Sequence, residues 1–324
     1  MKPFLFALNV AVSCLGVAGA ALADTAENYP HRPITIVIPY SAGGGTDQFM
    51  RIAAERAAEE LGQQFIIVNK PGASTVIGVN SVVNAKPDGY TLLVSTNTSY
   101  TLIPSAISPS PYSPEKSLQY VATLGGTEMV LTARLGVPTS LSEILEKSRQ
   151  DPGHYTYATY GVGSSTHLAG EVLMDDTGTE FRHIPYKGVE AVTALAGGQV
   201  DLMVDGTNAA GAMIKAGKTK SIVVLQHHRS EYLPDTPTLT EAGYPNATAS
   251  AISYIMAVPK GTPQPIVEKL GKAFSVAMQD PGVKEKIKAM RSTSAFLDAA
   301  ETQRFVNEQA AAFKDIVQKK NIKF

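Results

Sequence analysis

The chain has no tryptophan, a single cysteine and no block of like charge in its 324 residues. Its formal net charge of -1 gives no basic field that would attract nucleic acid or an anionic membrane surface. The sequence has no G-x-S-x-G or H-E-x-x-H motif, and its six histidines lack metal-ligand spacing. We therefore expect no metal, no cofactor and no catalytic site, and any anion must be recognised by local groups.

A secreted hydrolase built on Ser164 and His167 is the enzymatic alternative. These two residues stand three apart at one predicted helix start. That spacing does not by itself orient a base onto a nucleophile. The composition, with 44% hydrophobic and 18% charged residues, is that of an ordinary soluble protein long enough for two domains.

The first 23 residues are typical of a secretory signal peptide. Lys2 precedes an apolar run, and a small-residue cleavage site ends at Ala23. Cleavage there removes Cys14, so the mature chain would have neither a disulfide nor a thiol nucleophile. An uncleaved anchor and a lipoprotein at Cys14 ("AVSC") are the alternatives. We expect a secreted protein.

A glycine-rich loop follows the first apolar run after the leader. Residues 34–38 ("ITIVI") are β-branched, as in a strand buried on both faces. The loop "PYSAGGGT" leads into a segment with helical spacing, which Thr46 or Asp47 is placed to cap. Glycines let backbone N–H groups at a helix start approach an anion. A plain tight turn is the alternative.

The same unit of strand, glycine loop and helix recurs along the first half. Strands are predicted at 64–69 and 90–96, with a glycine loop at 70–74 between them. Such alternation predicts a parallel sheet with helices on both faces, and ligands bind beyond the carboxyl ends of its strands. Loops 40–46, 71–75 and 95–100 are therefore expected to converge.

The pattern restarts near Glu128 and predicts a second α/β domain. Ser140 and Glu143 form a capping box before a helix at 140–150. Strands are expected within 129–133, 155–160, 181–188, 200–206 and 221–226, with a glycine-containing loop and a helix after the second of these. We assign residues 24–127 and 227–324 to domain 1 and residues 128–226 to domain 2, with crossings near 123–132 and 220–226.

Seven ordered motifs resemble the tripartite tricarboxylate transporter receptors, the Bug or TctC family. The motifs are "PYSAGGGTDQFMR", "NKPGASTVIG", "KPDGYTLLVSTNTSYTLIPSA", "PYSPEKSLQYVA", "GSSTHLAGE", "HIPYKGVEAVTALAGGQVDLMVDG" and "VPKGTP". The resemblance implies a periplasmic binding protein of the type II, Venus flytrap, architecture. Its two α/β domains would close on a small organic carboxylate and deliver it to a membrane transporter.

The resemblance also implies the ligand-binding residues, position by position. In the first domain they are Tyr40, Ser41, Ala42, Gly43, Gly44, Asn97 and Thr98. In the second domain they are Gly161, Gly163, Ser164, Ser165, Thr166, His167 and Asp205. One departure is the absence of the tryptophan and glycine that family members often carry before the last motif, where this chain has Ser253 and Ile255.

Several of these side chains have a structural alternative. Asp47 and Arg51, four apart on one helix, are expected to pair with each other. His167 would either donate to the ligand or fix its own turn. Asp205 would either bind a ligand amine or hydroxyl or serve as a turn carboxylate. Tyrosines near the loops, such as Tyr254, fit a domain interface better than an aromatic ligand.

The partners expected from these observations are a small organic anion and membrane transporter subunits, with no nucleic acid, and the protein is expected to be a monomer. Mono-, di- and aromatic carboxylates stay open because no arginine lies in the candidate loops. A sensor role, in which the loaded protein contacts a signalling ectodomain, is the alternative to transport.

Overall fold

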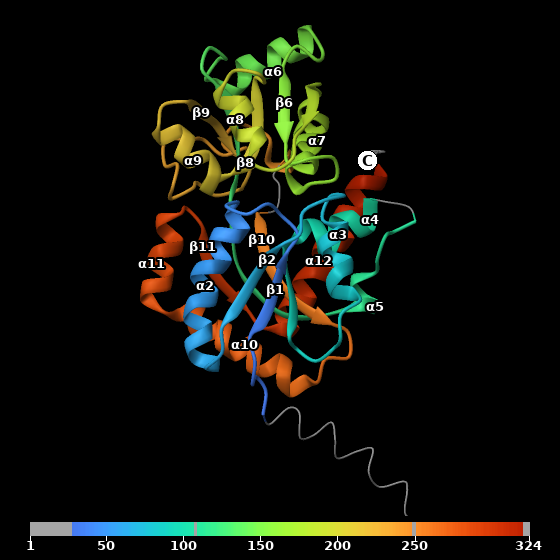
Figure 1. The fold of residues 1–324 in the computed structure, drawn as a ribbon. Coiled ribbons are helices and arrows are strands. Elements are labelled where there is room, and N and C mark those ends of the chain that lie inside the picture. The colour runs from blue at the N-terminus through green and yellow to red at the C-terminus, as the bar shows by residue number, and fades with distance from the viewer. Residues whose placement is uncertain (1–27, 107–108, 248–250, 320–324) are drawn as a thin grey trace, which may run out of the picture.

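The computed structural model describes residues 28–106, 109–247 and 251–319, and these build two lobes around two β-sheets (Figure 1). The predicted leader, its cleavage site and Cys14 lie outside the described residues. Each sheet is mixed in strand direction and carries helices, so the α/β prediction is confirmed. The parallel arrangement predicted for the first three strands is found, and antiparallel strands are added beside them in the same sheet.

The first sheet has six strands in the order β11-β4-β10-β3-β1-β2. Their bounds are β1 (Ile34–Ile38), β2 (Phe65–Asn69), β3 (Thr91–Thr96), β4 (Leu118–Thr127), β10 (Ile252–Pro259) and β11 (Thr293–Leu297). β1 pairs in parallel with β2 and β3, as predicted. The chain leaves this sheet along β4 and returns to it along β10, so β10 runs antiparallel to its neighbours β4 and β3.

Alternate residues of β1 face different helices. Ile34, Ile36 and Ile38 pack with α2 (Gly45–Leu61) and α10 (Gln264–Gln279), next to α11 (Pro281–Ala289). Val37 packs on the opposite face with α3 (Val76–Val83) and α12 (Ala299–Lys319). Both faces are therefore buried, as the unbroken apolar run "ITIVI" predicts.

The second sheet has five strands in the order β7-β6-β8-β5-β9. Their bounds are β5 (Met129–Arg134), β6 (Thr156–Thr159), β7 (Arg182–Pro185), β8 (Leu202–Gly206) and β9 (Thr219–Val224). On β8, Leu202 and Val204 face the side of α6 (Leu141–Gln150) and α7 (Ser165–Thr177), and Met203 faces α8 (Glu190–Ala196). α9 (Thr207–Lys215) follows β8 directly.

The chain passes from one sheet to the other in two places. The first is β4 to β5, with only Glu128 between the strands, inside the predicted range. After β9 the chain stays with the second sheet, since Val224 bridges Thr238 and the 3-10 turn η2 (Pro245–Ala247) packs on α7. The second crossing therefore comes after residue 247, and we propose to extend domain 2 to that point.

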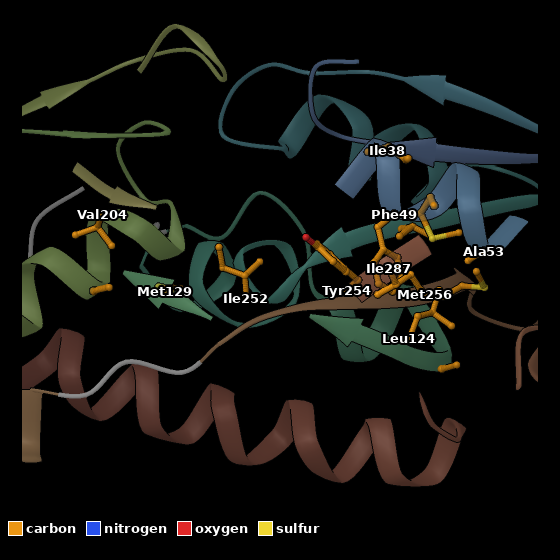
Figure 2. Close-up of a cluster of buried hydrophobic side chains, with 14 of the residues drawn as sticks. Ile38, Phe49, Ala53, Leu124, Met129, Val204, Ile252, Tyr254, Met256 and Ile287 are labelled. Atoms are coloured by element: carbon orange, nitrogen blue, oxygen red, sulfur yellow. The ribbon is translucent and has the colours of Figure 1, made fainter. Parts of the chain in front are cut away.

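Apolar side chains continue between the two lobes. Figure 2 shows Tyr254 between the group around Phe49 and the group that includes Ile252, Met129 and Val204. On another side, Phe313 of α12 packs with Leu168 and Val172 of α7. Among the described helices, none combines the length and the apolar content of a membrane span.

The predicted cap of α2 is wrong, and the predicted cap of α6 is right in position only. α2 begins two residues earlier than a cap at Thr46 predicts, with Gly44 as its N-cap, so Thr46 and Asp47 lie within its first turn. α6 begins after Ser140, but the Ser140 side chain makes no capping bond and its hydroxyl lies 2.6 Å from that of Ser142. Three short helical segments lie between β3 and β4: the π-helical turn η1 (Thr98–Leu102), α4 (Ile103–Ala106) and α5 (Pro114–Ser117).

Candidate functional site

The predicted site residues lie where strands end and the two lobes meet. Those of the first domain are in the β1–α2 loop (Tyr40, Ser41, Ala42, Gly43, Gly44) and after β3 (Asn97, Thr98). Those of the second domain are in the β6–α7 loop and the first turn of α7 (Gly161, Gly163, Ser164, Ser165, Thr166, His167) and at the end of β8 (Asp205). In Figure 1 these strand ends face each other across the junction of the lobes.

The β3 and β6 loops are in direct contact. The hydroxyls of Thr98 and Ser165 lie 3.1 Å apart, and the backbone N–H of Ser165 donates to Thr98 Oγ1 at 3.1 Å. Ser74 Oγ in the β2–α3 loop donates to the backbone oxygen of Val162 at 2.9 Å. The two domains are therefore in direct contact at these loops.

Hydroxyl groups join the three predicted loops of the first domain. Tyr40 Oη lies 2.7 Å from Thr96 Oγ1 and accepts from Ser95 Oγ at 3.2 Å. Ser95 Oγ lies 2.6 Å from Ser99 Oγ, which donates to Thr75 Oγ1 at 2.9 Å. The expected convergence of these loops is thus observed, but the Tyr40 hydroxyl is engaged within its own domain.

The glycine loop differs from the expected arrangement of free amides. Gly43 has a φ of +80°, which glycine adopts readily, and its N–H donates to Asp47 Oδ2 at 2.9 Å. Gly44 has a φ of −72°, and its N–H lies 3.4 Å from the Ser41 oxygen. Asp47 also pairs with Arg51 at 2.9 Å, which confirms the predicted structural pair.

The start of α2 is nevertheless suited to an anion. Its N-cap residue, Gly44, makes no side-chain capping bond. The N–H groups of its first turn, beginning at Gly45, have no acceptor within the helix, and the helix dipole favours negative charge there. The anion-binding amides of this loop are therefore expected one or two residues later than Gly43 and Gly44.

Gly45 contacts the second domain closely. A Cβ atom at this position would lie 2.1 Å from Nδ2 of Asn208, in the first turn of α9, and 3.3 Å from the Tyr254 hydroxyl. Asn208 Nδ2 donates to that hydroxyl at 3.2 Å. Gly45 belongs to the predicted glycine loop, but neither it nor Asn208 is among the residues predicted to bind the ligand. The only local signals were the third glycine of the run and the position of Asn208 just after β8.

His167 uses both ring nitrogens close to its own helix. Nδ1 accepts the N–H of Gly163 at 3.2 Å, and Nε2 lies 3.4 Å from a Glu171 oxygen. Its ring stacks on His183 with 4.1 Å between centroids. Ser164 caps α7 by accepting the His167 N–H at 3.1 Å. This geometry supports the turn-fixing role of His167 over direct ligand contact.

Asp205 is a buried carboxyl group at the domain junction. Its Oδ1 accepts from the Tyr160 hydroxyl at 2.6 Å and from the Gly206 N–H at 2.7 Å. Burial raises the pKa of Asp205 to about 7, although both hydrogen bonds favour the charged form. Burial, together with the neighbouring Asp205, raises the pKa of Tyr160 well above its ordinary value.

A surface pocket of about 540 Å³ lies elsewhere, beside α6 and β9, and includes Ser140, Ser221 and Tyr244. None of the predicted site residues lines it. The domain junction, where two helix starts and several hydroxyls meet, is chemically the better candidate for binding an anion.

Comparison with known proteins decides the family. A model described as tripartite tricarboxylate transporter family receptor matches residues 49–322. The chain belongs to this family. It is 36% identical over 288 residues to a UPF0065 protein of Bordetella pertussis, covering 88% of each chain. It is 31% identical over 326 residues to protein BugT of the same organism, covering 100% of this chain and 99% of BugT.

Solved structures of this receptor family agree with the fold. The periplasmic binding protein BugD superposes with a TM-score of 0.85 at 32% identity, covering 91% of this chain and 99% of BugD. MatC from Rhodopseudomonas palustris with bound malate superposes with a TM-score of 0.83 at 29% identity, covering 89% of this chain and 100% of MatC. R. palustris Rpa4515 with adipate superposes with a TM-score of 0.86 at 28% identity, covering 91% of this chain and 99% of Rpa4515. The receptor thus has the two-domain fold of a TctC/Bug periplasmic solute-binding protein.

Proposed function

We propose that this receptor captures a small organic carboxylate between its two domains in the periplasm and delivers it to a tripartite membrane transporter. The observation that carries the proposal is the contact of Thr98 with Ser165, which brings the β3 loop of one domain onto the first turn of α7 in the other. The uncapped start of α2 lies at the same junction. A ligand held there would contact both domains.

The interaction energies are sufficient for such a ligand. A carboxylate that accepts hydrogen bonds from helix-start amides and hydroxyls gains roughly 1.5–3 kcal/mol for each charge-assisted bond. A few such bonds reach the roughly 8 kcal/mol of micromolar binding. Malate and adipate, bound by the relatives MatC and Rpa4515, are carboxylates of suitable size and support the proposal.

The proposed binding role is tested by a thermal-shift screen of small carboxylates on the purified receptor, with malate and adipate included. A ligand that binds only the folded state is expected to stabilise it by about 2.7 kcal/mol at a hundredfold excess over its Kd. The ligand should be recovered chemically unchanged at one equivalent per chain. Steady conversion of a bound carboxylate, or no shift with any carboxylate, would contradict the proposal.

A further inference from the structure

Asn97 carries a buried acceptor that the described part of the chain leaves without a donor. The residue is 1% exposed, at the end of β3. Its Nδ2 donates to the backbone oxygen of Ala251 at 3.2 Å. This bond fixes the orientation of the amide, because the reverse orientation would set two oxygens against each other. Oδ1 is therefore the unpaired atom, and it has no hydrogen-bond partner among the described residues.

The position of Asn97 connects this acceptor with the proposed ligand site. The next residue, Thr98, makes the contact with Ser165 of the second domain. Ala251, which engages the other end of the Asn97 amide, directly precedes β10 on the segment that returns from the second domain. The unpaired oxygen thus belongs to the junction where the two domains meet, and buried acceptors of this kind normally have a donor.

A carboxylate group cannot supply that donor, because an ionised carboxylate only accepts hydrogen bonds. A ligand that only accepts hydrogen bonds would leave the Asn97 oxygen unpaired, whereas a hydroxyl or ammonium group on the ligand could donate to it.

We propose that the site selects carboxylates that also carry a hydroxyl or ammonium group, and that Asn97 Oδ1 accepts a hydrogen bond from that group. This inference rests on the proposed binding function and specifies the ligand class within it. The selectivity follows from the penalty for leaving a buried polar group unpaired, which rejects the analogue that lacks the donor.

Matched ligand pairs test the selectivity by calorimetric titration. The pairs are succinate with malate, succinate with aspartate, and propionate with lactate, each differing by one donor group. The wild-type receptor is expected to bind the donor-bearing member of at least one pair tenfold or more tightly. The Asn97→Leu variant, similar in size but without the acceptor, should reduce that preference to less than threefold, mainly by binding the donor-bearing member more weakly.

Thr101→Val is the matched control. The Thr101 hydroxyl donates to the backbone oxygen of Asn97 at 2.7 Å, so this variant disturbs the same turn without removing Oδ1. It should keep the wild-type preference. Equal binding within every pair by the wild-type protein would overturn the inference and leave the binding function standing, as would an Asn97→Leu variant that keeps the preference. Failure to bind any small carboxylate would overturn both the function and the inference.

Discussion

Replacing Gly45 by valine is expected to weaken carboxylate binding at least a hundredfold, about 2.7 kcal/mol. The new Cβ would overlap Asn208 Nδ2, only 2.1 Å away, and would approach the Tyr254 hydroxyl at 3.3 Å. The γ carbons of valine would reach further into the junction. Asn208 would have to turn away and give up its hydrogen bond to the Tyr254 hydroxyl, and a ligand bound between the starts of α2 and α9 would lose contacts.

Gly44→Ala is the control for this substitution. The residue has an ordinary φ of −72°, and an added Cβ would meet only the Ser41 oxygen at 3.4 Å. It should change the affinity less than threefold. Calorimetric titration gives the affinities, and melting curves of both variants show that they are folded at the titration temperature. If Gly45→Val binds as tightly as Gly44→Ala, the ligand does not lie at this junction.

Replacing Asp205 by asparagine is expected to stabilise the protein above pH 7, by up to about 4 kcal/mol. Burial raises the pKa of Asp205 from its ordinary value of 3.8 to about 7. Between these values the folded state holds a proton that the unfolded state has lost, so the contribution of Asp205 to stability falls as the pH rises through this window. Asparagine keeps an oxygen for Tyr160 and Gly206 and carries no charge.

Urea unfolding at pH 5 and pH 8 measures this effect. The stability gained by Asp205→Asn should be larger at pH 8 by about 2–3 kcal/mol. Asp201→Asn is a control whose effect should not change in this range, because hydrogen bonds from Thr156 and Arg134 lower the pKa of Asp201 below its ordinary value of 3.8 despite its partial burial. That variant should lose the same stability at pH 5 and pH 8, and the loss should shrink only below the ordinary carboxyl pKa. A gain for Asp205→Asn that does not change with pH would show that Asp205 stays ionised in the folded protein.

Local patterns predicted the strands well. The run Ile34–Ile38 forms β1 with the predicted bounds, and β3 and β5 differ from their predictions by one residue at one end. β-Branched and apolar residues determine these segments directly. The relative direction of the strands was not predictable in this way, because β10 is inserted between β3 and β4 from residues more than 120 positions away in the sequence.

The meeting of the predicted loops at the domain junction could be predicted, but their detailed contacts could not. Glycine loops after buried strands indicated the domain junction, since the carboxyl ends of strands meet there. Which amides are available depends on contacts that no local pattern encodes. The Asp47 carboxylate accepts the hydrogen bond of the Gly43 N–H, and Asn208 lies next to Gly45 only because the two domains meet. The capping box at Ser140 failed because its hydroxyl has an alternative partner in Ser142.

The central claim, that the ligand is bound between two domains that must open to admit it, can be tested with a disulfide across the junction. Ser41 in the β1–α2 loop faces Gly188 in the β7–α8 loop, and a Cβ at Gly188 would lie 3.7 Å from the Ser41 Cβ. That distance suits a disulfide, for which Cβ atoms are about 3.5–4.5 Å apart. The only native cysteine is Cys14, within the predicted leader.

The decisive measurement is ligand binding by the Ser41→Cys, Gly188→Cys double variant, using a carboxylate that stabilises the wild-type protein. Each single variant controls for the substitutions themselves, including the strain of a side chain at Gly188, where φ is +67°. When the double variant is oxidised without ligand, it should bind no carboxylate until a reductant is added. When it is oxidised with the carboxylate bound, it should retain that carboxylate through dialysis. An oxidised, empty protein that binds as fast and as tightly as its reduced form would contradict capture between the domains.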